Sequence, residues 1–304
     1  EALDSAIMRS GRFDRKIHVS RPNLKERKEL FDFYLKKVAT DPSVTSDILA
    51  RRSLWYTPSD VDSVVREAAI IALREKRETI NMKDLSEAYD RVTYGNKSNI
   101  KMTPEEKRWT AYHETGHAIL GYLLHPKDDI VKATIIPRKG FLGFVQNRPP
   151  VEYYSSNKEE LIAEIKMFIA SYVAEEITFG STSTGVGGSP SADFAHALNV
   201  ARNMAWSFGM GKSGLVGDFR SYLAYDGKEN MLSDKTKELL EEDVQNILRE
   251  SIADVRNILT QHRDLFNYFA EELLKKEELE YDEIQAIFDK FNVKPLSGRP
   301  RLEI

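Results

Sequence analysis

The chain has 304 residues, a length typical of about two domains, and 41% of them are hydrophobic, which is enough to bury more than one core. Its formal net charge is −4 with 30% charged residues, a mildly acidic balance that gives no reason to expect nucleic acid as a partner. It contains no cysteine, which excludes disulfides and thiolate metal sites, so any metal must be held by nitrogen and oxygen ligands.

No apolar run approaches the roughly 20 residues that a membrane-spanning helix needs, and the N-terminus lacks a signal-peptide pattern. The absence of cysteine fits a reducing compartment. We therefore expect this chain itself to be soluble, with any membrane anchor supplied by segments outside these residues.

The first 95 residues predict a small helical domain that follows the end of another structural unit. Residues 1–20 read as a polar loop and a short strand with no partner before it, as expected of a piece of a longer protein. Apolar residues then recur at helical spacing over 23–38 and 58–76, and a third helix is expected from Met82 to about Val92.

A polar, turn-prone stretch at 94–99 marks the expected domain boundary. Beyond it, Thr103 and Pro104 predict the start of a long helix over 104–124, because threonine is a good N-cap and proline suits the first turn. Short β-branched or apolar runs at 131–136 and 143–146 predict a small β element. The remainder is expected to be mostly helical, over 159–179, 192–207, 234–259 and two shorter pieces that reach Phe291.

The most informative motif, His113-Glu114-Thr115-Gly116-His117, lies in the middle of the long predicted helix. Residues i and i+4 of a helix share one face, so His113 and His117 can present two imidazole nitrogens to one metal ion. Glu114 projects beside that site, where its carboxylate can act as a general base toward a metal-bound water. The spacing therefore predicts a zinc-dependent peptidase site.

A catalytic zinc generally takes three protein ligands, so a third must come from elsewhere in the chain. A histidine six residues after the second would extend the motif, but that position is Leu123. The downstream candidates are Glu175, Glu176, Asp193 and His196. Asp193 follows a loop rich in Gly, Ser and Thr at the start of a predicted helix, whereas the two glutamates could instead orient a histidine or lie on the surface. Residue types alone leave these alternatives open.

Several segments together resemble the FtsH-type AAA+ zinc metalloproteases, the M41 peptidase family, which has bacterial, mitochondrial (i-AAA and m-AAA) and chloroplast members. The resemblance is carried by His113 to Ala118, by Ala133 to Arg138, and by Ala174 to Ile177 with Phe179-Gly180. It covers nearly the whole chain. It implies a zinc-dependent endopeptidase with one Zn²⁺ per subunit and with Glu114 as the general base.

The resemblance also implies an identity for the third ligand. The family's aspartate ligand lies in a Ser-x-Asp segment before a helix that reads Ala-x-x-x-Ala-Arg-x-Met. Here these are Ser191-Ala192-Asp193 and residues 197–204. The family pattern thus selects Asp193 to complete the metal site with His113 and His117.

At the N-terminus, Met8-Arg9 and Gly11 to Arg15 resemble the end of the AAA second region of homology. The resemblance implies that Arg9 and Arg12 reach the ATP of a neighbouring subunit, where planar guanidinium groups suit phosphate charge. Read without the family, the same run is a basic solvated loop. Residues 21–97 resemble the AAA helical lid, although Trp55 and Pro58 replace residues usual in the family.

The fold class implied by the resemblance is mainly α, in three parts. Residues 1–20 would be the C-terminal remnant of an AAA α/β ATPase core, residues 21–97 the AAA helical lid, and residues 98–304 an α-helical zincin-type metallopeptidase domain with a small β element. In the complete protein we expect ATP with Mg²⁺, polypeptide substrates and a homohexamer. Membrane anchoring, in a bacterial inner membrane or an organelle membrane, would come from segments absent from this chain.

Two glycine-rich stretches imitate nucleotide-binding loops. Gly211-Lys212-Ser213 lacks the glycine that a phosphate loop needs five positions earlier, where Trp206 stands, and residues 185–188 lack a preceding strand. The sequence contains no true phosphate loop, so we expect that the 304-residue chain alone does not hydrolyse ATP.

The leading function hypothesis is an endopeptidase that degrades unfolded or membrane-extracted proteins, with the substrate adding as a strand near residues 141–145. The alternative is a non-catalytic assembly or adaptor module that keeps the protease fold. The intact Glu114 argues against that alternative, because a pseudo-enzyme has no need of a general base.

Overall fold

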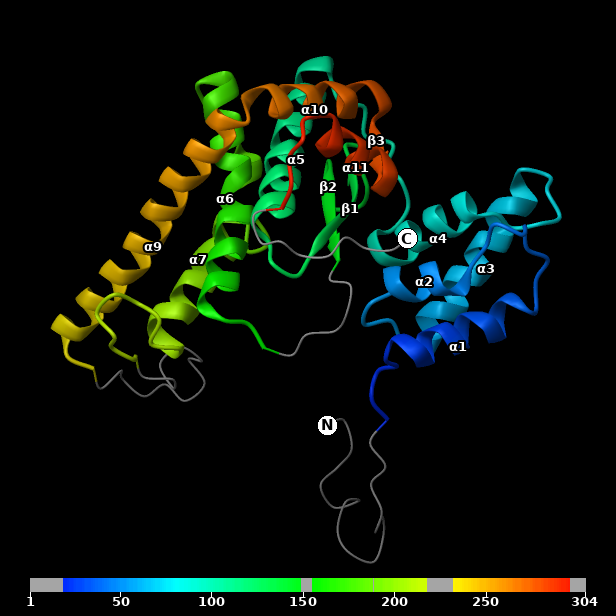
Figure 1. Cartoon of the computed structure of the whole chain (residues 1–304), viewed down its shortest axis with the longest axis horizontal. Coiled ribbons are helices and arrows are strands. Elements are labelled where there is room, and N and C mark those ends of the chain that lie inside the picture. The colour runs from blue at the N-terminus through cyan, green and yellow to red at the C-terminus, as the bar shows by residue number, and fades with distance from the viewer. Residues whose placement is uncertain (1–18, 149–154, 188, 218–231, 296–304) are drawn as a thin grey trace, which may run out of the picture. The chain divides into compact units, whose positions relative to one another are not determined.

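The computed structural model describes residues 19–148, 155–187, 189–217 and 232–295 (Figure 1). The chain divides into two compact units, residues 1–92 and residues 93–304. Both units are built mainly from helices, which confirms the predicted fold class.

The first unit contains helices α1 (Leu24–Leu35), α2 (Ser46–Arg52), α3 (Pro58–Arg74) and α4 (Met82–Tyr94), the last of which ends just beyond the unit. Capping boxes begin α1 and α3: Asn23 pairs with Glu26, and Thr57 pairs with Asp60. The apolar faces of these helices form a buried core that includes Phe31, Leu49, Val61, Val64, Val65, Ala68, Leu85 and Ala88. Helix α2 was not predicted from the sequence.

An ion pair fixes the chain between α3 and α4. Arg77 donates hydrogen bonds to both carboxylate oxygens of Asp84, at 2.7 and 2.5 Å, and Asp84 also accepts one from the backbone of Asn81 at 2.9 Å. The Asp84 side chain is 4% exposed. The hydrogen bonds from Arg77 outweigh the opposing effect of burial and hold the pKa of Asp84 below its usual range.

The second unit contains six α-helices and one 3₁₀ turn in its described residues, apart from the π-helical turn described below. They are α5 (Pro104–Leu124), α6 (Lys158–Phe179), the single 3₁₀ turn η1 (Thr184–Val186), α7 (Asp193–Arg202), α9 (Asp234–Gln261), α10 (Arg263–Lys276) and α11 (Tyr281–Lys290). The last five residues of the predicted helix 192–207 form a π-helical turn, η2 (Asn203–Ser207). Within this unit α9 lies alongside α6 and α7 (Figure 1).

A small antiparallel sheet with the strand order β2-β1-β3 lies beside α5. Its strands are β1 (Asp129–Thr134), β2 (Phe144–Arg148) and β3 (Glu278–Glu280). The central strand β1 is buried along its whole length and includes Lys132, whose Nζ lies 2.9 Å from Glu280 Oε1 and 3.4 Å from Glu278 Oε1. The predicted β element is therefore present, but its third strand comes from near the end of the chain.

Helices α5 and α6 pack closely enough to require a glycine. A Cβ atom at Gly116 would lie 2.6 Å from the backbone oxygen of Ala170 and 2.9 Å from Ala174 Cβ. One of these atoms belongs to the backbone and the other is a Cβ atom, so neither can move away by a side-chain rotation. Gly116 therefore lets α5 bring its two histidines against α6.

Within the described residues, no helix combines the length and the apolarity that crossing a bilayer requires.

Candidate metal centre

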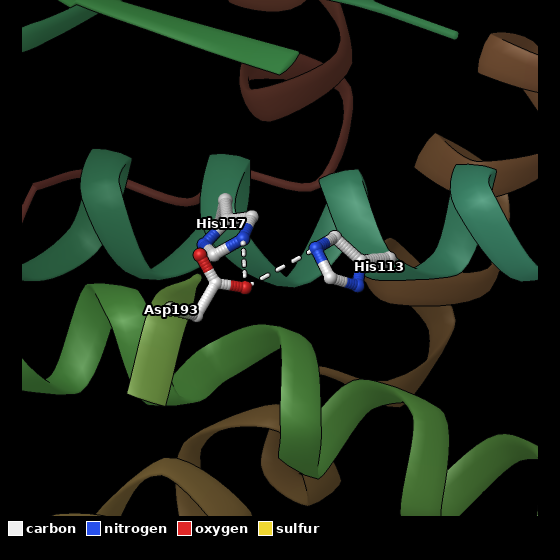
Figure 2. Close-up of side chains that lie close together, drawn as sticks. All are labelled: His113, His117 and Asp193. Carbon is white, nitrogen blue, oxygen red and sulfur yellow. Dashed lines mark hydrogen bonds and ion pairs between the residues drawn. The ribbon is translucent and has the colours of Figure 1, made fainter. Parts of the chain in front are cut away.

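Helix α5 presents His113 and His117 on one face, as their four-residue spacing predicts. Asp193, the first residue of α7, faces both rings (Figure 2). Its Oδ2 atom lies 3.2 Å from Nε2 of His113 and 3.2 Å from Nε2 of His117. The structure thus brings together two predicted ligands on one helix and a third on another.

The three candidate ligand atoms all lie within 4.8 Å of one another. Their side chains are between 14% and 18% exposed, so the cluster is screened from bulk water but can be reached from it. Two imidazole nitrogens and one carboxylate oxygen form a donor set that zinc takes in catalytic sites, where three protein ligands leave a position open.

The contacts of the Nδ1 atoms of His113 and His117 also fit a zinc site. His117 Nδ1 lies 2.8 Å from the backbone oxygen of Met167, which can only accept a hydrogen bond, so Nδ1 must carry the proton. His113 Nδ1 lies 2.8 Å from Glu175 Oε1. In a neutral ring, a proton on Nδ1 leaves the lone pair on Nε2, which is the nitrogen that faces Asp193. The residues therefore fit a zinc ion.

The protein groups alone form a strongly coupled ion-pair cluster. Burial would lower the pKa of His113, but hydrogen bonds to Asp193 and Glu175 outweigh it and raise this pKa to about 10. Burial would raise the pKa of Asp193, but the charges and hydrogen bonds of His117 and His113 hold it well below its usual range. Metal binding would release a proton from a protonated histidine of this cluster, because a histidine binds a metal ion only as the neutral imidazole.

Glu114 lies next to this cluster without belonging to it. Its side chain is 5% exposed, and burial raises the pKa of its carboxyl above the usual range. A Cβ atom at Gly143 would lie 2.9 Å from Glu114 Oε1 and 2.8 Å from the backbone oxygen of Thr134. The carboxylate of Glu114 thus lies in close contact with Gly143, in the segment just before β2. Sequence reasoning did not predict this contact.

A pocket of about 1360 Å³ opens over the cluster. Its lining includes the segment Gly140 to Val145, which leads into β2, and residues of the loop that precedes α7. Its apolar lining includes Phe141, Leu142, Phe144, Val145, Met167 and Phe168. Glu114 and both histidines line the same pocket, so a bound chain could reach them.

The other candidates for the third ligand lie elsewhere. Glu175 is almost fully buried and contacts His113 Nδ1, on the side of the ring away from Asp193, and it also accepts hydrogen bonds from Ser183. Glu176 forms an ion pair with Arg256. His196 stacks on Phe168, with ring centroids 5.0 Å apart. Arg9 and Arg12 lie outside the described residues.

The glycine-rich loop around Lys212 is filled by a side chain of the protein itself. The backbone N–H groups of Lys212 and Ser213 donate to Asp243 Oδ1 at 3.0 and 3.2 Å, and a Cβ at Gly211 would lie 2.2 Å from Asp243 Oδ2. This loop therefore has the anion-binding backbone of a phosphate site, but its anion is a carboxylate from α9.

Comparisons with known proteins assign both parts of the chain. Residues 100–287 match the model of peptidase family M41, and residues 43–87 match that of the AAA+ lid domain. The chain is 36% identical to the ATP-dependent zinc metalloprotease FtsH of Chlorobium luteolum, over 95% of this chain and 41% of that protein. The same name describes a Rickettsia prowazekii relative that is 36% identical over 98% of this chain and 46% of the relative.

A third relative, ATP-dependent zinc metalloprotease FtsH 3 of Symbiobacterium thermophilum, is 34% identical over 99% of this chain and 49% of its own length. The chain therefore spans a little less than half the length of these curated relatives.

Proposed function

The chain belongs to peptidase family M41, as its sequence resemblance predicted, and from that premise we propose that it is the proteolytic part of an ATP-dependent zinc metalloprotease. The observation that carries the proposal is the convergence of His113 Nε2, His117 Nε2 and Asp193 Oδ2 within one pocket. We assign these three residues as the ligands of one zinc ion. When bound, zinc would polarise the scissile carbonyl and acidify a water molecule.

Glu114 is the proposed general base. Its carboxylate accepts a proton from the water that attacks the scissile carbonyl carbon, and it later gives that proton to the leaving amine nitrogen. Burial supports both steps, because a carboxyl with a raised pKa holds the transferred proton more readily than an exposed one does. The histidines and Asp193 keep the metal in place and take no part in this proton transfer.

The substrate is proposed to bind as an extended chain along β2. Among the described strands β2 is an outer strand with β1 on one side, and an outer strand is where an extended peptide can add to a sheet. Backbone pairing does not depend on the identity of the substrate side chains. The apolar lining of the pocket suits hydrophobic segments that are exposed only in unfolded proteins. Unfolded or membrane-extracted polypeptides fit these requirements.

The motor of the complete protein is proposed to be an AAA+ ring. The match of residues 43–87 to the AAA+ lid and the names of the relatives support ATP dependence. A homohexamer, nucleotide contacts by Arg9 and Arg12 in a neighbouring subunit, and membrane anchoring through segments outside this chain complete the proposal. None of the observations favours a non-catalytic adaptor.

The test compares zinc content and peptide cleavage of the purified chain, with an unstructured casein and a fluorogenic peptide as substrates. Glu114→Gln should keep zinc and lose cleavage by at least about 100-fold, because it lacks a general base. Asp193→Ala should lose both zinc and cleavage. Glu242→Gln, an exposed change on α9, is the control and should match the wild type. Equal cleavage by Glu114→Gln and wild type would contradict the proposal.

A further inference from the structure

Helix α6 carries a row of three groups at four-residue intervals: the backbone oxygen of Met167, the hydroxyl of Ser171 and the carboxylate of Glu175. Four-residue spacing places them on one stripe of the helix. Each group contacts a different member of the metal cluster. The two outer members of the row contact the histidines, and the middle one contacts the aspartate.

The contact of Ser171 is the shortest in the cluster. Its Oγ atom lies 2.5 Å from Asp193 Oδ2, the same oxygen that faces both histidine Nε2 atoms. Ser171 is completely buried. Its hydroxyl also lies 3.2 Å from the backbone oxygen of Phe168, but it has one proton, and a charged carboxylate at the shorter distance is the stronger acceptor.

Asp193 needs such a contact more than the histidines do. The histidines lie within a 21-residue helix, where the neighbouring turns fix the backbone. Asp193 is the first residue of α7, and its N-cap, Ala192, provides no side-chain hydrogen bond to the helix end. The orientation of the Asp193 carboxylate therefore depends on contacts across to other helices, and Ser171 provides one from the interior of α6.

We propose that Ser171 is a positioning residue for Asp193. Its hydroxyl holds the carboxylate so that Oδ2 faces the two Nε2 atoms before a metal arrives, and this orientation raises metal affinity because less side-chain freedom is lost on binding. The inference rests on the proposed zinc site, and it adds a residue to which neither the sequence motifs nor the family resemblance pointed.

The experiment measures the affinity of the whole chain for Zn²⁺ by competition with a chromophoric chelator. It also records the visible spectrum of the Co²⁺-substituted protein, which reports ligand geometry directly. Ser171→Ala should weaken Zn²⁺ binding by about 10-fold, the lower end of the effect of removing such an orienting partner, and should change the Co²⁺ spectrum. Ser171→Thr keeps the hydroxyl and should restore most of the affinity.

The matched control is Ser251→Ala, which removes an equally buried serine hydroxyl from α9. It should leave both the affinity and the spectrum unchanged. If Ser171→Ala does not fold, Ser171→Gly takes its place, because glycine also lacks the hydroxyl and should show the same loss. An equal loss of affinity in Ser251→Ala would overturn the proposal, because the effect would then not be specific to Ser171.

A double-mutant cycle separates the contact from a general effect on packing. Asp193→Ala should be purified without zinc, but its two histidines should still bind added metal far more weakly than the wild type does. In that background the further change Ser171→Ala should not alter the weak affinity, since the hydroxyl has no carboxylate to hold. Unchanged affinity and spectrum in the single variant Ser171→Ala would overturn the positioning role while leaving the zinc site intact. A wild-type chain that binds no Zn²⁺ would instead refute the proposed function itself.

Discussion

At the scale of single residues, the side chain of Glu114 is held in place by its neighbours, as the metal cluster is. Gly143 provides a backbone without a side chain where Glu114 Oε1 and the oxygen of Thr134 both approach. One of these neighbours is backbone and cannot rotate away. The position of the general base therefore depends on a glycine 29 residues further along the chain.

Replacing that glycine should affect catalysis more than metal binding. Gly143→Ala puts a methyl group within 3 Å of both neighbours, so Glu114 must shift from the pocket wall. A displacement of about 1 Å at a catalytic group can cost about 100-fold in rate, and we expect kcat/KM for a fluorogenic peptide to fall by that order. Zinc content should stay at the wild-type level.

The control for this prediction is Gly187→Ala, whose added methyl would meet Phe194 at an ordinary 3.7 Å and no other described residue within 4 Å. It should bind zinc and unfold as the wild type does. A Gly143→Ala variant that loses zinc and cleavage in equal measure would contradict the prediction, because the methyl would then be acting on the ligands and not on the base.

Sequence reasoning located part of this site. The spacing of His113, Glu114 and His117 predicts their geometry because a helix places i and i+4 on one face. Asp193 could not be derived from residue types, since its place in the cluster depends on how α7 packs against α6. Ser171 and Gly143 carried no signal, because a serine inside a helix and a glycine before a strand are ordinary in a sequence.

At the scale of secondary-structure elements, Asp84 illustrates how one ion pair holds the start of a helix. It lies in the first turn of α4, accepts the backbone N–H of Asn81 and pairs with Arg77. A negative charge in the first turn also complements the helix dipole. The segment between α3 and α4 is thereby fixed at its end.

Asp84→Asn should destabilise the first unit by about 2 kcal/mol at pH 7, in the range of hydrogen bonds to charged groups. The pKa of Asp84 is lower in the folded chain than in the unfolded one. Its stabilisation is therefore complete above about pH 4, where the unfolded carboxyl is also ionised, and is lost as the pH falls through the folded pKa. The difference between variant and wild type should thus shrink toward pH 3.

The measurement is urea unfolding at several pH values, with unfolding of the first unit followed by pulse-labelled hydrogen exchange of α4. Asp47→Asn is the control, because Asp47 forms exposed pairs with Arg51 and Lys28 that should contribute less than about 1 kcal/mol. A loss that is the same at pH 7 and pH 3 would show that the charge of Asp84 is not what stabilises the helix.

Most helices could be predicted because their apolar residues recur over three turns or more, as in α3, α5 and α6. Helix α2 was missed because seven residues are too short to show a period. Strand β3 was missed because Glu278-Leu279-Glu280 is extended only through pairing with β1, about 145 residues earlier in the chain. Pairing over such distances leaves no local pattern.

At the scale of the whole molecule, the proposed metal connects α5 and α7, whose ligands are oriented by α6, and all three helices belong to the second unit. A ligand that binds only the folded state stabilises it by about 4 kcal/mol when its concentration is 1,000 times Kd. Zinc should therefore stabilise the second unit selectively. The two units offer an internal comparison within one chain.

Removing zinc with a chelator should raise hydrogen exchange in α5, α6 and the start of α7, and leave α1, α2 and α3 unchanged. The experiment is hydrogen–deuterium exchange with mass spectrometry on the full chain, with and without chelator. The Asp193→Ala variant, which is expected to lack zinc, serves as the control and should not respond to the chelator. Equal loosening of α1–α3 would contradict a zinc effect confined to the second unit.

The sheet beside α5 also has a consequence for biosynthesis. Strand β1 is buried between β2 and β3, and its Lys132 has two carboxylate partners on β3. A ribosome exposes both histidines more than 160 residues before it exposes β3 and α11. A partly translated chain therefore carries the metal-binding helix while β1, the central strand of the sheet, still lacks one neighbour. We expect that such a nascent chain cannot yet cut its surroundings, so that peptidase activity begins only after β3 has been made and has paired with β1.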